Sequence, residues 1–182
     1  MRHRFVFLAA VAVAAVGSVV GCGDDKAPPK QAVFWLGLGP GGGMTCSSTR
    51  NYQFPAEARA TITSTTAEGE RIEDDADNLV DCDVRLARGS TTDFNVSLRY
   101  SGVEVGNFSA NGTLTAEGGE LDIDFNTGMF ALEQENCVAT VKTLRAGAVW
   151  ISGLRCQSLR DPSSPSIQCD GQGGLIFENC DR

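Results

Sequence analysis

Apolar and polar side chains alternate with a period of two over most of the chain from residue 57 onward. Within residues 79–88, LVDCDVRLAR, the inward positions are Val80, Cys82, Val84 and Leu86, and the positions between them are charged. Such alternation indicates β-strands with one buried and one exposed face. Residues 57–65, EARATITST, alternate in the same way and predict a further strand. No segment predicts a convincing helix, and the best window, residues 129–136, is barely two turns long.

The clearest alternation, in residues 92–125, predicts a three-stranded meander. A first turn is expected at Ser101-Gly102, with Tyr100 opposite Val103. One kinked strand then runs through residues 103–116, including Asn111-Gly112, with a bulge near residues 106–107 where the apolar phase shifts. A second turn is expected at Gly118-Gly119. Eight to ten short strands of this kind predict an all-β, antiparallel β-sandwich or jelly roll, with a β-barrel as the alternative.

Two features frame this domain at its N-terminal side. Arg2 and Arg4 precede twelve apolar residues, 5–16, and then the small residues Gly17 and Ser18. A charged start, a short apolar region and small residues are typical of an export signal, and the run is shorter than the roughly 20 residues that a membrane-spanning helix needs. The predicted organisation is a signal peptide over residues 1–21, a tether over residues 22–31 and a single β domain over residues 32–182.

The leader ends in Val19-Val20-Gly21-Cys22, which resembles the lipobox of bacterial lipoproteins. The resemblance covers residues 1–22 only, and Val19 stands where Leu is commoner. It implies that the leader is removed before Cys22 and that this cysteine becomes the acylated first residue. Two or three fatty chains anchor a protein firmly, whereas one anchors it marginally. Gly23, rather than Asp, after the cysteine implies the outer membrane by analogy with enterobacterial lipoproteins.

Six cysteines remain after Cys22, and an even number in an exported chain predicts three disulfides. They are Cys46, Cys82, Cys137, Cys156, Cys169 and Cys180. A hairpin turning at residues 146–147 places Cys137 opposite Cys156, and a turn at residues 161–164, DPSS, instead places Cys156 opposite Cys169. The two prolines near the second turn favour the second pairing. The predicted bonds are therefore Cys156–Cys169, Cys137–Cys180 and Cys46–Cys82.

Charge and histidine content exclude several functions. Without residues 1–21 the chain has 13 basic and 23 acidic residues, a formal charge of −10, which argues against binding nucleic acid or adhering electrostatically to anionic lipid. The only histidine is His3, in the leader, so the mature chain lacks a Ser-His-Asp triad, a Cys-His pair or a histidine-ligated zinc. No catalytic residues, cofactor or metal site are therefore predicted.

Carboxylates and aromatic rings supply the remaining candidates. Asp122 and Asp124 alternate on one strand and are the candidates for carboxylate-only hydrolysis, although a solvated strand face is the better interpretation. The acidic stretch 68–83 contains the weak calcium candidates Asp74, Asp75 and Asp77, without the spacing of an EF-hand. Four aromatic residues are candidates for a stacking platform or for the core: Trp35, Tyr52, Tyr100 and Trp150.

The sequence thus predicts a non-enzymatic envelope lipoprotein whose β domain has a structural or ligand-binding role. Its expected partners are a membrane, through the lipid, and an envelope protein or glycan. A carbohydrate- or calcium-binding module is the first alternative. A carboxylate-dependent hydrolase is the second.

Overall fold

The computed structural model describes residues 27–40, 46, 49–102, 106–128 and 131–181. Most of the described chain lies in strands, and the one helix is α1 (Ala58–Thr63). The strands are β1 (Gln31–Pro40), β2 (Arg50–Phe54), β3 (Ile72–Glu73), β4 (Asn78–Leu86), β5 (Phe94–Gly102), β6 (Gly106–Thr115), β7 (Gly118–Asn126), β8 (Ala131–Arg145), β9 (Ala148–Asp161) and β10 (Ser164–Glu178). Within the described residues, no helix is both long and apolar enough to cross a bilayer.

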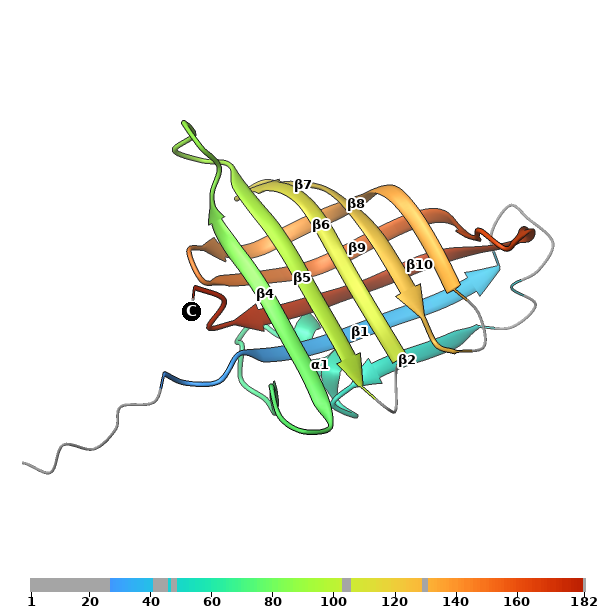
Figure 1. The fold of residues 1–182 in the computed structure, drawn as a ribbon, viewed down its shortest axis with the longest axis horizontal. Coiled ribbons are helices and arrows are strands. Elements are labelled where there is room, and N and C mark those ends of the chain that lie inside the picture. Colours follow the sequence, from blue (N-terminus) through green and yellow to red (C-terminus); the bar gives the residue numbers. More distant parts are fainter. Residues whose placement is uncertain (1–26, 41–45, 47–48, 103–105, 129–130, 182) are drawn as a thin grey trace, which may run out of the picture.

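All ten strands belong to one antiparallel sheet in the order β2-β1-β10-β9-β8-β7-β6-β5-β4, with β3 paired to β1. The sheet curls into a half-barrel, so that β4–β7 cross in front of β8–β10 and β1 (Figure 1). The all-β antiparallel prediction is confirmed. A sandwich or jelly roll is not confirmed, because the strands do not divide into two separate sheets.

The inner face of the curled sheet forms the main hydrophobic core. Phe34 of β1 packs against Phe108 of β6 with ring centroids 4.6 Å apart. Tyr52 of β2 meets Phe125 of β7 edge to face at 4.9 Å. Such contacts join the two halves of the sheet by burying aromatic surface, the largest hydrophobic contribution that single side chains make.

A second, smaller apolar cluster lies on the outer face, under α1. Ala58 and Ile62 of the helix are fully buried there, against Trp35 and Trp150 of the sheet. Trp150 Nε1 donates a hydrogen bond to the Ile62 carbonyl at 3.1 Å. The predicted strand over residues 57–65 is therefore wrong. Positions i and i+4 lie on the same face of a helix and also on the same face of a strand, so the spacing alone fits both, and two alanines favour the helix.

The meander is present, but its register differs from the predicted one. Tyr100 pairs with Phe108, not with Val103, because the described second strand, β6, begins at Gly106. Residues 103–105 lie outside the described residues. The bulge expected near residues 106–107 is absent, because Gly106 and Asn107 pair in regular register with Gly102 and Ser101. β6 does run through Asn111-Gly112 as predicted. The next turn falls at residues 116–117, one to two residues earlier than expected, so that Leu114 pairs with Gly119.

The six cysteines form three disulfides, as predicted, but all three predicted pairings are wrong. The bonds are Cys46–Cys169, Cys82–Cys180 and Cys137–Cys156. The hairpin turning at residues 146–147 is present and aligns Cys137 with Cys156. The DPSS turn is also present, since Asp161 pairs with Ser164. Three additional residues on β10 then shift the register, so that Cys169 lies opposite Leu159 and beyond the reach of Cys156.

We refer to the end of the half-barrel where the described chain enters β1 as the entry end. It comprises Pro29–Gln31, the half of β4 from Asp81 to Leu86, the turn 145–148 and the segment 178–181. Asn179 Nδ2 donates to the Pro29 carbonyl at 2.8 Å, and Gly147 N donates to the Val84 carbonyl at 2.9 Å. With the Cys82–Cys180 bond, these contacts tie the otherwise open edge of β4 to the rest of the sheet.

Candidate functional site

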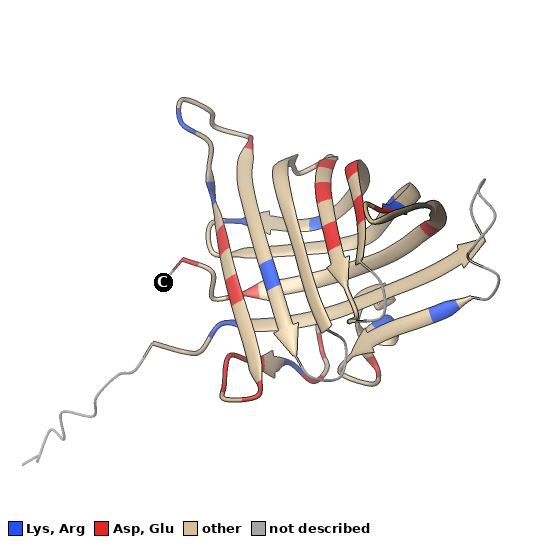
Figure 2. Ribbon diagram, turned by 45° about the vertical axis from the view of Figure 1, so that its right-hand side comes forward, with Lys and Arg blue, Asp and Glu red and all other residues tan. Residues whose placement is uncertain are grey.

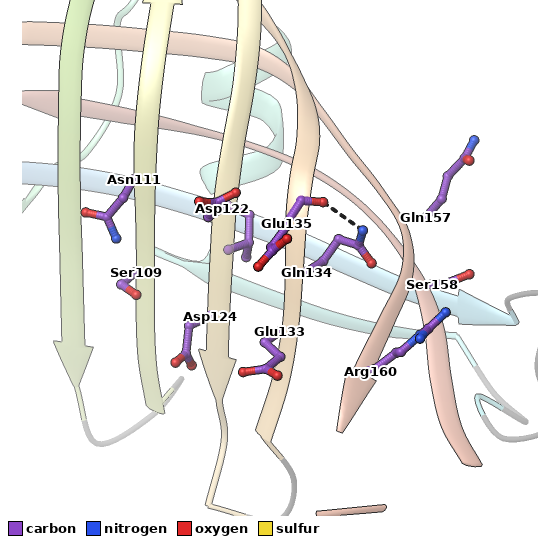
Figure 3. A pocket seen from close by; sticks show the side chains of 11 residues that line it. Ser109, Asn111, Asp122, Asp124, Glu133, Gln134, Glu135, Gln157, Ser158 and Arg160 are labelled. Atoms are coloured by element: carbon purple, nitrogen blue, oxygen red, sulfur yellow. Dashed lines mark hydrogen bonds between the residues drawn. The ribbon is translucent and has the colours of Figure 1, made fainter. Parts of the chain in front are cut away.

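A cleft of about 800 Å³ lies on the outer face of the sheet, where β6–β9 lie next to one another. Its lining is mostly polar and exposed (Figure 3). The lining residues are Ser109, Asn111, Asp122, Ile123, Asp124, Glu133, Gln134, Glu135, Gln157, Ser158 and Arg160. We refer to it as the cleft, and to the end of β8 and β9 that carries it as the cleft end.

The cleft forms because β8 and β9 part. Glu133 pairs with Arg160 and Val138 pairs with Arg155, and no backbone pairing is recorded between these two positions. Asn136 and Ser158, one on each parted strand, have φ values of 60° and 64°. Left-handed backbone is uncommon in residues other than glycine, so both strands leave regular β geometry here. Figure 3 shows the two ribbons diverging around Gln134 and Gln157.

Two carboxylates replace backbone hydrogen bonds that the parted strands lose. Asp122 accepts a hydrogen bond from Asn136 N at 3.1 Å. Asp170 of β10 accepts one from Ser158 N at 3.0 Å. Both hydrogen bonds are exposed, so each contributes at most the about 0.5–1.5 kcal/mol of an ordinary intramolecular hydrogen bond. The Asp122 side chain therefore has a structural role in holding the bulge of β8.

Asp124 and Glu133 have a different position. They lie directly opposite each other on β7 and β8, and both are exposed. Like charges at directly opposed positions destabilise a sheet. Within the described residues neither carboxylate forms an ion pair. Carboxylate, amide and hydroxyl groups gathered in this way can accept and donate hydrogen bonds to a polar or cationic ligand.

The turn next to the cleft is held by a buried carboxylate. Asp161, only 5% exposed, accepts hydrogen bonds from Ser163 N at 2.8 Å and from Ser163 Oγ at 2.6 Å. The hydrogen bond from the Ser163 hydroxyl is the main reason why the pKa of Asp161 lies below its ordinary value. This carboxylate fixes the β9–β10 turn at the rim of the cleft.

The acidic calcium candidates are engaged in the loop between β3 and β4. Asp75 Oδ1 accepts hydrogen bonds from Asp77 N and Asn78 N, both at 2.8 Å. The hydrogen bond from Asp77 N is the largest cause of the lowered pKa of Asp75. Asp74 accepts a hydrogen bond from Val80 N at 3.0 Å. Among the residues described, no three His, Cys, Asp or Glu side chains are grouped closely enough to hold a metal ion.

The four aromatic residues do not form an exposed platform. Trp35, Tyr100 and Trp150 are buried, and Tyr52 packs half-buried against the main core. Arg59 of α1 lies over the Trp35 ring at 4.6 Å, and Lys142 lies over the Trp150 ring at 3.8 Å. Both indoles on the outer face are therefore covered by cations.

No known protein family matches this chain, nor does any characterised protein or solved structure. The cleft therefore has to be interpreted from its own chemistry.

The sequence alone points to only some of the residues of this site. Asp122 and Asp124 were candidates, whereas Glu133, Glu135 and Arg160 were not. The available signal was the lost alternation in residues 133–136, EQEN, which fell in the best helical window. That segment is the bulged part of strand β8, in agreement with the prediction that this window is not a convincing helix. Cys22, the predicted lipidation site, lies outside the described residues.

Proposed function

We propose that this chain is an exported, non-enzymatic lipoprotein of the bacterial cell envelope, held to the outer membrane through acylated Cys22. The observation that carries the proposal is the lipobox-like segment Val19–Cys22 behind a short apolar leader. The disulfides support it, because all six remaining cysteines are paired and structural disulfides persist in oxidising compartments. The absence of histidine from the mature sequence supports a role other than catalysis.

Mass spectrometry of the protein purified from bacterial membranes tests the anchor directly. The expected result is a chain beginning at Cys22 with a diacylglyceryl group on its sulfur and an acyl group on its new amino terminus. A Cys22→Ser variant is the control, and it should retain the leader or be processed at another bond. An unmodified mature terminus in the wild-type protein would reject the proposal.

The β domain itself is proposed to bind a polar partner, an envelope glycan or an envelope protein, at the cleft. The wide polar cavity between β6 and β9 supports this role, since it offers carboxylate, amide and hydroxyl groups together. A glycan would bind through hydrogen bonds, because the aromatic rings that usually stack on sugars are buried in this domain. A calcium-binding module is less well supported, given the engaged carboxylates of the acidic loop.

Purified cell-wall glycan provides a direct probe of the cleft. Wild-type protein should co-sediment with it, and a Gln134→Ala/Gln157→Ala variant should co-sediment at least several-fold less. The control is Gln53→Ala, which makes the same kind of substitution at an exposed position on β2 outside the cleft lining. Equal binding by all three proteins would place the ligand elsewhere, and a requirement for added calcium would favour the metal-dependent module.

A hydrolase remains the second candidate because Asp124 and Glu133 are opposed. Residues directly opposite on neighbouring strands have Cβ atoms about 4.5–5.5 Å apart. Retaining glycosidases hold their two carboxyl groups at a comparable separation, about 5–5.5 Å. Release of reducing sugar ends from the same glycan, abolished by Asp124→Asn and by Glu133→Gln alike, would establish this activity in place of simple binding.

A further inference from the structure

The hairpin joining β4 to β5 projects beyond the sheet (Figure 1). Its tip is held by its own hydrogen bonds: Ala87 N donates to the Asp93 carbonyl at 2.8 Å, and Ser90 Oγ accepts from Asp93 N at 2.9 Å. At the base of the tip Leu86 is 49% exposed, so its predicted inward position is wrong: the strand ends here, beyond the core. The flanking Arg85 and Arg88 are exposed as well. An ordered tip therefore presents an apolar side chain between two basic ones.

This tip lies on the same side of the molecule as the entry of the chain. Figures 1 and 2, which differ by a rotation of 45°, both place the hairpin, the C-terminal segment and residues 27–30 on the left-hand side. The contacts agree, because successive residues of β4 reach each of these parts. Lys30 Nζ binds Asp81 at 2.6 Å, Cys82 is bonded to Cys180, and the Val84 carbonyl accepts from Gly147 N.

We propose that this entry end, with Leu86 and the β4–β5 tip, rests on the surface of the bilayer that holds Cys22, and that the cleft consequently faces away from the membrane. The inference depends on the proposed lipid anchor. It adds the orientation of the β domain relative to the membrane, and a second contact in which the β4–β5 tip touches the phospholipid headgroup region.

The length of the tether supports contact. Lys30 is eight residues after Cys22, and an extended chain covers at most about 3.6 Å per residue, or ~29 Å in all. The entry end therefore cannot move far from the lipid. The cleft lies at the other end of β8, since Glu133 precedes Arg145 by twelve residues and a strand rises about 3.3 Å per residue, or ~40 Å.

The distribution of charge supports the same orientation. All three ion pairs found among the described residues lie at or beside the entry end: Lys30–Asp81, Arg71–Glu178 and Arg85–Asp83. Three of its carboxylates, those of Asp81, Glu178 and Asp83, are thus matched, whereas Asp181 and the adjoining acidic loop 73–77 form no ion pair among the described residues. Arg88 and Arg145 are exposed there in addition. The cleft carboxylates are not matched in this way. Anionic headgroups attract nearby basic side chains and repel carboxylates, so they favour the entry end over the cleft.

A bilayer suits this surface better than a protein partner does. A specific protein interface buries about 800 Å² on each side, in well-packed contact. The exposed apolar part of the tip is a single leucine, which is too little for such an interface. A leucine flanked by arginines can instead enter the interfacial region while the guanidinium groups remain among the headgroups.

Tryptophan fluorescence tests the orientation on the full lipidated protein. Leu86→Trp, Val138→Trp and Leu79→Trp place a probe at the three exposed large hydrophobic side chains found, which are 49%, 55% and 42% exposed. Each variant is placed in vesicles of phosphatidylcholine and phosphatidylglycerol whose acyl chains carry bromine, a contact quencher. Trp35 and Trp150 are buried and form a common background in all three variants.

The Leu86→Trp variant should be quenched roughly twice as strongly as the Val138→Trp variant, and adding Arg88→Glu should reduce the difference. Equal quenching of the variants in vesicle-bound protein would overturn the orientation and leave the anchor standing. So would shielding of the Leu86→Trp probe from aqueous acrylamide without quenching by bromine, since a protein partner would then cover the tip. Protein that fails to float with the vesicles at all would instead reject the anchor.

Discussion

Both ends of strands β8 and β9 carry many charged side chains, but the two ends arrange these charges in opposite ways. At the entry end, carboxylates are paired with basic side chains, and the edge of β4 is closed by a disulfide and backbone hydrogen bonds. At the cleft end, the strands part and Asp124 and Glu133 face each other without a cation between them (Figure 3). The first arrangement favours stability. The second costs stability, as binding surfaces commonly do.

The largest expected effect is on attachment of the protein to the membrane, which is assigned to the entry end. Cys22→Ser in a chain from which the leader, residues 1–21, has been removed should lower the membrane-bound fraction more than a hundredfold, because even one fatty chain contributes a partition coefficient on the order of 10⁴ M⁻¹. Fractionation of cells and flotation of the purified protein measure this effect. The cleft variant Glu133→Gln serves as the control and should remain bound. Membrane binding that survives the loss of Cys22 would mean that the protein surface itself holds the bilayer.

The next largest effect concerns the disulfides of the two ends. Cys82–Cys180 links residues 98 apart and Cys137–Cys156 links residues 19 apart. In the chain-entropy account, replacing each pair by alanines should lower the free energy of unfolding by about 4.7 and about 3.2 kcal/mol. Denaturant unfolding of both double variants, compared with the wild type, measures the difference. A larger loss for Cys137→Ala/Cys156→Ala would show that the bond beside the cleft has a packing role beyond restricting the unfolded chain.

These disulfides also mark how far the sequence could be interpreted. The even number of cysteines predicted three bonds, and the alternation predicted the strands that carry them. Connectivity failed because it depends on register, and three additional residues after the DPSS turn separate Cys156 from Cys169. Nothing in the local sequence signals that bulge. Cys82 and Cys180 meet only because the sheet curls, which is a long-range property of the fold.

The residues of the cleft, like the disulfides, could be predicted from the sequence only in part. Alternation placed Asp122 and Asp124 on the outer face of a strand, and both lie there. The opposing Glu133 could not be assigned, because its position depends on the pairing of β7 with β8 across a bulge. Alternation likewise failed for α1, where buried Ala58 and Ile62 satisfy both a helical and a strand period. Period alone does not decide such a short segment.

A smaller effect concerns the opposed carboxylates of the cleft. Glu133→Gln removes the repulsion with Asp124 and should raise the free energy of unfolding by roughly 0.2–1 kcal/mol at low ionic strength. The gain should shrink as salt is added, because exposed charges are screened. Thermal or denaturant unfolding at two salt concentrations measures both effects. Destabilisation by this substitution would show that the Glu133 carboxylate has a stabilising partner, for which the neighbouring Arg160 would be the first candidate.

The smallest effect concerns the paired charges of the entry end and depends on pH. The hydrogen bond from Lys30 is the main cause that lowers the pKa of Asp81 below its ordinary value of 3.8. A carboxyl whose pKa is lower in the folded protein stabilises the fold at pH values above its unfolded pKa, and this contribution disappears as the pH falls through the folded pKa. Asp81→Asn should therefore cost less than about 1 kcal/mol at pH 7, since the Asp81 side chain is 61% exposed. The difference from the wild type should diminish below pH 3.8 and vanish in stronger acid, in unfolding measured across this range. At pH 7, Glu133→Gln should change the free energy of unfolding in the opposite direction, because it removes a repulsion rather than an attraction. If both substitutions change the free energy of unfolding in the same direction, the charges of the two ends do not differ in how they contribute to stability.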